Sequence, residues 1–183
     1  ELPVKCGFKE IEVGFPSSGA TDFDWIQGLV RDGRIPDDVT PQVLTQSRAD
    51  LIRTSFDSLQ GAKTAIVHVY NALAPAWRKI VFGMEPHEIK QIAIDGAKQL
   101  RDNAARLPGT HWRFQYSPEC FSTTELDFSI ETCAAVMEIL QPTADNPIIL
   151  NLPATVEAAT ANIYADQIEY FAKNLPNRDA ALL

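Results

Sequence analysis

The sequence predicts an α/β protein of the parallel (β/α)8 TIM-barrel class, present as an incomplete barrel, and three observations support this prediction. Strand-like apolar runs begin near residues 10, 42, 65, 112 and 147, and helical patterns fill every gap between them. Connections of that length do not fit tight hairpins, so successive strands are expected to pair in parallel. The strand-like runs also turn polar at their carboxyl ends, which is how a barrel enzyme gathers side chains at one rim.

The first two helices are predicted from their caps and glycine stops. Thr21 or Asp22 can cap a helix over about 21–32, which Gly33 ends. Ser47 can cap a second helix over 47–59, where apolar residues form one stripe. The first eight residues are expected to run directly into the first strand.

Three further helices are predicted along the rest of the chain. The longest is expected over 86–106, because proline suits the first turn of a helix and the apolar residues share a face. Thr123 or Thr124 is expected to begin a helix that continues to Leu140. Asn162 is expected to cap the last helix, which ends near Asn174.

Five complete strand–helix units are visible, whereas a whole barrel of this class has more. We therefore expect residues 1–183 to form one partial barrel domain, which ends from Ala180 in the first half of another strand. A doubly wound fold is the alternative, but the chain has neither GxGxxG nor GxxxxGK[ST], the glycine-rich phosphate loops typical of such folds.

Composition excludes several classes of function. The formal net charge of −8 and pI near 4.8 argue against a nucleic-acid partner, because phosphates would be repelled. Three cysteines without CxxC spacing do not suggest a disulfide scaffold or a structural zinc site, and a reducing compartment fits best. No apolar stretch approaches the roughly 20 residues that cross a bilayer, so no membrane association is expected.

Two titratable residues are candidates for chemistry. Glu119 closes a strand at the predicted rim, where a carboxylate can act as general base or hold a substrate. The alternative is a rim carboxylate that only caps the following turn. His68 lies within an apolar strand, on the face shared with Ile66 and Tyr70, and a hydrogen-bonded core histidine is the favoured interpretation from the residues alone.

Two polar residues near the last complete strand are candidates for substrate binding. Asn151 offers an amide at the strand end, and Thr155 a hydroxyl after the stiff turn at Pro153. Both suit recognition of a carboxylate or carbonyl oxygen, although Thr155 can also simply cap the turn. The chain has no HxH or HExxH motif and no G-x-S-x-G elbow, so no metal site or activated nucleophile is visible.

Taken together, five blocks of sequence resemble the 2-isopropylmalate synthase family in order and over essentially the whole chain. They are EIEVGFPSS (10–18) with TDFD (21–24), IPDDV (35–39) with VLTQ (43–46), IVHVYN (66–71), RFQYSPE (113–119) with TEL (124–126), and NLPATVE (151–157).

The resemblance implies a metal-dependent (β/α)8 barrel that condenses acetyl-CoA with 3-methyl-2-oxobutanoate in leucine biosynthesis. Residues 1–183 would then be a partial catalytic domain of the pyruvate-carboxyltransferase type, with about strands 2 to 6 of the barrel and, from Ala180, the start of strand 7. The resemblance also implies a divalent metal cofactor (Zn, Mg or Mn) in the full-length enzyme, a homodimer, and a cytoplasmic location, with an organelle (mitochondrial or plastid) as the alternative in a eukaryote. It assigns Glu119 as the active-site carboxylate and Thr155 to the carboxylate of the 2-oxo acid. The residues that it places around the isopropyl group are His68, Ser117, Asn151 and Pro153.

The family's metal-binding blocks have no counterpart in this chain, because an Asp-Arg-Asp-Gly block would precede Glu1 and a His-Pro-His block would follow Leu183. We therefore expect an internal fragment that is inactive and poorly soluble on its own. Two alternatives stay open: a related acyl-CoA condensing enzyme that makes homocitrate or citramalate, and a non-catalytic α/β binding domain.

Overall fold

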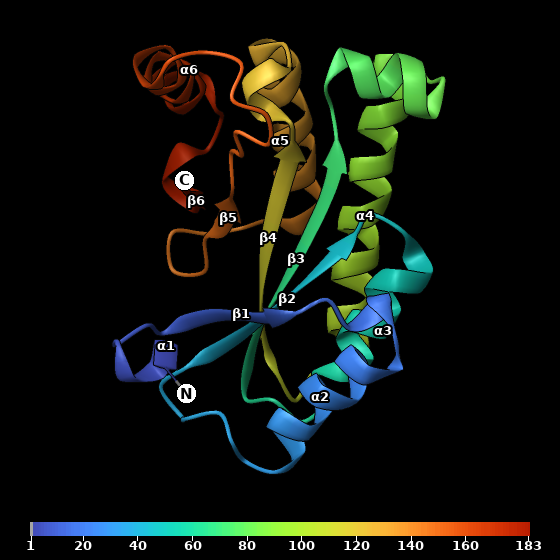
Figure 1. The fold of residues 1–183 in the computed structure, drawn as a ribbon, viewed down its shortest axis with the longest axis vertical. Helices are drawn as coiled ribbons and strands as arrows, with labels where there is room; N and C mark the ends of the chain where they lie inside the picture. The colour runs from blue at the N-terminus through green and yellow to red at the C-terminus, as the bar shows by residue number, and fades with distance from the viewer. Residues whose placement is uncertain (1) are drawn as a thin grey trace.

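A computed structural model describes residues 2–183, which form one parallel sheet with helices between its strands (Figure 1). The strands are β1 (Glu10–Gly14), β2 (Thr40–Gln46), β3 (Thr64–Ala72), β4 (His111–Glu119), β5 (Ile148–Leu150) and β6 (Ala181–Leu182). The α-helices are α1 (Leu2–Lys5), α2 (Ala20–Arg31), α3 (Ala49–Ser58), α4 (Pro86–Arg106), α5 (Leu126–Leu140) and α6 (Ala161–Asn174). Short 3-10 helices lie at Pro16–Ser18, Phe121–Thr123 and Arg178–Ala180, and Trp77–Phe82 is a π-helix.

The strands follow one another in the order β1-β2-β3-β4-β5-β6, and every neighbouring pair is parallel. Right-handed crossovers between consecutive strands put their helices on the same face of a sheet. A doubly wound fold would reverse its strand order, so the order confirms the predicted barrel arrangement. Within residues 2–183 the sheet does not close into a barrel, and β1 and β6 lie at its two edges. In Figure 1, β1 runs crosswise to β4.

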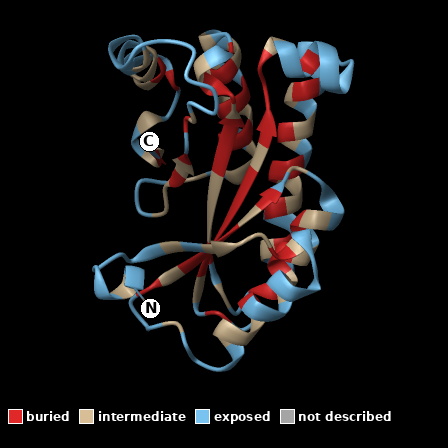
Figure 2. Ribbon diagram, viewed as in Figure 1, coloured by how far each residue is buried: buried red, intermediate tan, exposed pale blue. Residues whose placement is uncertain are grey.

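The two faces of the sheet differ in polarity, because alternate side chains of a strand point to opposite sides. The helix-facing side is apolar: Val67 and Val69 of β3 and Tyr116 of β4 are fully or almost fully buried in the core. Figure 2 shows the buried residues concentrated on β3, β4 and the adjoining parts of α4 and α5. The other face carries polar side chains, among them His68 and Ser117.

The predicted strands and helices are all present, but several predicted caps are wrong. Helix α3 begins at Ala49 rather than Ser47, because the Ser47 hydroxyl donates instead to the carbonyl oxygen of Ile92 at 2.7 Å. Helix α5 begins only at Leu126, since the Thr124 hydroxyl donates to a carbonyl oxygen in the preceding turn. Helix α6 has Thr160, not Asn162, at its N-cap position.

The N-terminal prediction is also wrong, because Leu2–Lys5 form a helical turn before β1. The π-helix was not predicted. It is held by Arg78, whose buried guanidinium donates to Glu125 at 2.6 and 3.0 Å and to the carbonyl oxygen of Leu73 at 2.9 Å. These contacts fix the segment after β3 against the start of α5. None of the helices among residues 2–183 has the length and apolar character needed to cross a membrane.

Replacing Gly96 by alanine is expected to destabilise the fold by about 1–3 kcal/mol. A Cβ atom at this buried position of α4 would lie 2.1 Å from the Oγ of Ser47 and 3.2 Å from its Cβ. The clash forces Ser47 to give up its bond to Ile92, which outweighs the roughly 1 kcal/mol by which alanine favours a helix over glycine. The free energy of unfolding measured in urea tests this.

Gly109 supplies the matched control, because a Cβ there meets nothing within 4 Å. Gly109→Ala is expected to change the free energy of unfolding by less than about 0.5 kcal/mol. Equal effects of the two substitutions would show that contact with Ser47 is not the cause.

Candidate active site

The carboxyl ends of the parallel strands form the rim where the sequence placed its candidates. Glu119 is the last residue of β4 and is half-buried there. Burial raises the pKa of the Glu119 carboxyl above its ordinary value. A carboxylate with a raised pKa is a better proton acceptor at neutral pH than an ordinary surface glutamate, which suits a general base.

Thr155 lies directly beside the end of β4. Its Oγ1 accepts a hydrogen bond of 3.1 Å from the backbone N–H of Cys120, the residue after Glu119. Cys120 reaches this position with a φ of 62°, in the left-handed region. The same hydroxyl also lies within hydrogen-bonding reach of the Cys120 side chain, and it can donate its proton to an acceptor group such as a carboxylate when one is bound. This hydrogen bond holds the loop after β5 against the end of β4, next to Glu119.

His68 lies on the polar face of the sheet and is buried, with a relative exposure of 7%. Its Nε2 is 2.6 Å from the Oγ of Ser117, and its Nδ1 is 3.0 Å from a carboxylate oxygen of Glu12. The Nδ2 of Asn151 donates to the same Ser117 oxygen at 2.8 Å. The structure therefore joins three of the predicted pocket residues by hydrogen bonds, across β3, β4 and the end of β5.

Pro153 is partly buried in the loop that follows β5. A hydrogen bond ties this loop to α6, because the Tyr164 hydroxyl of that helix donates to the carbonyl oxygen of Leu152. The candidates thus form two groups, one around His68 and Ser117 and one around Glu119 and Thr155. Their contact with a substrate stays a prediction.

Sequence reasoning missed Glu12 and Gln42, which continue the first group onto β1 and β2. The amide of Gln42 donates to Glu12 at 2.8 Å. The hydrogen bond from His68 is the main reason why the pKa of the Glu12 carboxyl is lowered. The alternation Glu10-Ile-Glu-Val places Glu12 on the polar face, so the pattern was visible, but its partners were not.

These residues do not form a metal site by themselves. Among residues 2–183 there is no group of three His, Cys, Asp or Glu side chains that could hold a metal ion. The described side chains therefore do not fit the divalent cation that the resemblance implies.

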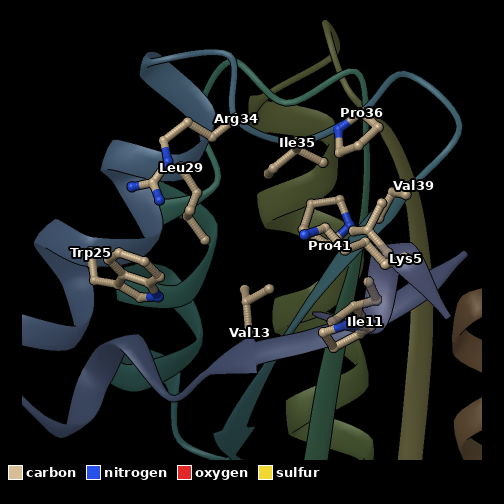
Figure 3. A pocket seen from close by; sticks show the side chains of 12 residues that line it. Lys5, Ile11, Val13, Trp25, Leu29, Arg34, Ile35, Pro36, Val39 and Pro41 are labelled. Carbon is tan, nitrogen blue, oxygen red and sulfur yellow. The ribbon is translucent and has the colours of Figure 1, made fainter. Parts of the chain in front are cut away.

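A separate hollow of about 560 Å³ lies on the other side of the edge strand (Figure 3). It is apolar and is lined by Ile11 and Val13 of β1, by Trp25 of α2 and by the start of β2. It contains none of the candidate residues, so it is distinct from the polar site.

Comparisons with known proteins agree with this architecture. The family model described as HMGL-like matches residues 2–182. The chain is 56% identical over 180 residues to a 2-isopropylmalate synthase of Pseudomonas entomophila (strain L48), covering 98% of this chain and 32% of the relative. It is 52% identical over 183 residues to a 2-isopropylmalate synthase of Mycobacterium leprae (strain TN), covering 100% of this chain and 30% of the relative. The chain thus spans about a third of the length of these relatives.

Proposed function

The chain belongs to the HMGL-like family, and on this premise we propose that it forms part of the catalytic barrel of a 2-isopropylmalate synthase. The proposed reaction is a Claisen-type condensation of acetyl-CoA with 3-methyl-2-oxobutanoate in leucine biosynthesis. The observation that carries the proposal is an identity of 52–57% to relatives of that name over at least 98% of the chain.

We assign roles to the chain's own residues as follows. Glu119 removes a proton from the acetyl methyl group, because its pKa is raised and it stands at the rim. Thr155 donates its hydroxyl proton to the carboxylate of the 2-oxo acid. The isopropyl group of the substrate packs against Pro153 and the side chains of His68, Ser117 and Asn151.

The remaining parts of the proposal concern the natural polypeptide at its full length. It would require a divalent cation (Zn, Mg or Mn) bound by residues outside those described. It would act as a cytoplasmic homodimer. The 183-residue chain alone is expected to be inactive, so measurable turnover of acetyl-CoA by this chain would contradict that expectation.

The test is a steady-state assay of CoA release by the natural polypeptide with acetyl-CoA and a divalent cation. We expect turnover with 3-methyl-2-oxobutanoate, at a kcat/KM at least about tenfold above that with 2-oxoglutarate or pyruvate. A preference for 2-oxoglutarate would instead indicate a homocitrate synthase, and a preference for pyruvate a citramalate synthase. Binding without turnover of any of the three would indicate a non-catalytic binding domain.

A further inference from the structure

A continuous chain of hydrogen bonds crosses the polar face of the sheet from β1 to the end of β5. This hydrogen-bond network consists of Gln42, Glu12, His68, Ser117 and Asn151. Its links are 2.8, 3.0, 2.6 and 2.8 Å long in that order. His68 and Ser117, at its centre, are 7% and 3% exposed.

The donors and acceptors in this network can be assigned by starting from the carboxylate of Glu12. The pKa of Glu12 is lowered, so near neutral pH it is ionised and only accepts. Nδ1 of His68 must therefore carry a proton and donate it to Glu12. In a neutral imidazole this leaves Nε2 without a proton, and Nε2 then accepts the hydrogen bond from Ser117.

The same assignment uses up the single proton of the Ser117 hydroxyl. That proton points to His68, while the oxygen accepts from the amide of Asn151. Ser117 thus presents no donor to a bound molecule. A substrate carboxylate at this wall would lose its hydration without gaining a hydrogen bond from Ser117, whereas an alkyl group loses nothing.

We propose that Glu12 is a positioning residue: through His68 it keeps the Ser117 proton turned away from the substrate, and so favours a 2-oxo acid with an apolar side chain. The part of this inference that concerns substrate choice rests on the proposed function. The part that concerns the imidazole does not, because the tautomer of a neutral His68 follows from its hydrogen bonds to the ionised Glu12 and to Ser117.

Two substitutions at Glu12 separate its charge from its hydrogen bond. In Glu12→Gln the amide oxygen can take the place of the carboxylate oxygen and still accept from His68, although the charge is gone. In Glu12→Met the acceptor is lost as well. His68 is then free to carry its proton on Nε2 and donate to Ser117, which releases the hydroxyl proton toward the pocket.

The first readout is nitrogen-15 NMR of the natural polypeptide with labelled histidine at pH 8, with the His68 signals identified by their loss in His68→Gln. We expect the Nδ1–H tautomer in the unsubstituted protein and in Glu12→Gln. We expect a shift toward Nε2–H in Glu12→Met. A predominantly Nε2–H tautomer in the unsubstituted protein would overturn the proposal even if Glu12→Met failed to fold.

The second readout is the ratio of kcat/KM for 3-methyl-2-oxobutanoate over 2-oxoglutarate. We expect Glu12→Met to lower this ratio about tenfold, mainly through KM, and Glu12→Gln to keep it within about threefold. Equal changes in the two variants would show that charge, not the hydroxyl direction, decides the preference, and would overturn the proposal. If the unsubstituted protein turned over neither acid, the proposed function would fail, while the NMR readout would still decide the role of Glu12.

Discussion

Replacing Glu119 by glutamine is expected to lower kcat for CoA release by about 10²–10⁴-fold in the natural polypeptide, the range typical of a lost general base. Glutamine keeps the size of the side chain at the end of β4 but cannot accept a proton at neutral pH. The KM for 3-methyl-2-oxobutanoate should change little, because Thr155 and the pocket wall remain. Steady-state kinetics at saturating acetyl-CoA measures both constants.

The same substitution should stabilise the fold at neutral pH. Burial raises the pKa of Glu119 in the folded state, so the folded protein binds this proton more tightly than the unfolded chain. Its contribution to stability is present at low pH and is lost as pH rises through the raised pKa. The amide of Glu119→Gln does not titrate, so the variant does not lose this stability as pH rises. Its unfolding temperature should exceed that of the unsubstituted protein at pH 7, and the difference should shrink toward pH 4.

This pair of results separates catalysis from folding. A residue that only capped the following turn would lose stability on substitution and would leave kcat close to its original value. Loss of activity together with a lower unfolding temperature at pH 7 would contradict the role that we assign to Glu119.

The sheet was predictable because its strands are coded locally. Apolar runs that contain single polar residues such as His68 and Ser117 form β3 and β4. The helical pattern between them requires a parallel crossover. Proline at position 86 marked the first residue of α4 correctly. The order of the strands in the sheet then follows from the order of the units in the chain.

The caps failed where a side chain found a partner far away in sequence. Ser47 is a good N-cap residue in isolation, but its hydroxyl bonds to Ile92, 45 residues later. The π-helix likewise depends on the pair between Arg78 and Glu125, 47 residues apart. No local pattern encodes such contacts, so they appear only once the helices are packed.

The site divides in the same way. Glu119 and Thr155 were predicted as separate strand-end residues. The fold brings them together, because the Thr155 hydroxyl accepts a hydrogen bond from the backbone N–H of Cys120, the residue after Glu119. Glu12 was missed for a different reason: it is an exposed glutamate on a short edge strand, and nothing in the local sequence distinguishes it from an ordinary surface residue. Its partner His68 lies 56 positions away.

Replacing Thr155 by valine is expected to raise the KM for 3-methyl-2-oxobutanoate about 10- to 100-fold. This corresponds to about 1.4–2.8 kcal/mol, the usual contribution of a hydrogen bond to a charged group. Valine has nearly the shape of threonine but no hydroxyl, so it can neither donate to the substrate carboxylate nor accept from the N–H of Cys120. Steady-state kinetics with varied 2-oxo acid and saturating acetyl-CoA provides the measurement.

Because this contact is made equally in the bound substrate and in the transition state, kcat should fall by less than about threefold. Thr155→Ser is the matched control, since it keeps the hydroxyl and removes only a methyl group, and its KM should stay within about threefold of the original value. If serine and valine raised KM equally, the methyl group rather than the hydroxyl would hold the site together. If kcat fell and KM did not, Thr155 would act by placing Glu119 through Cys120, and its assignment to the substrate carboxylate would be wrong.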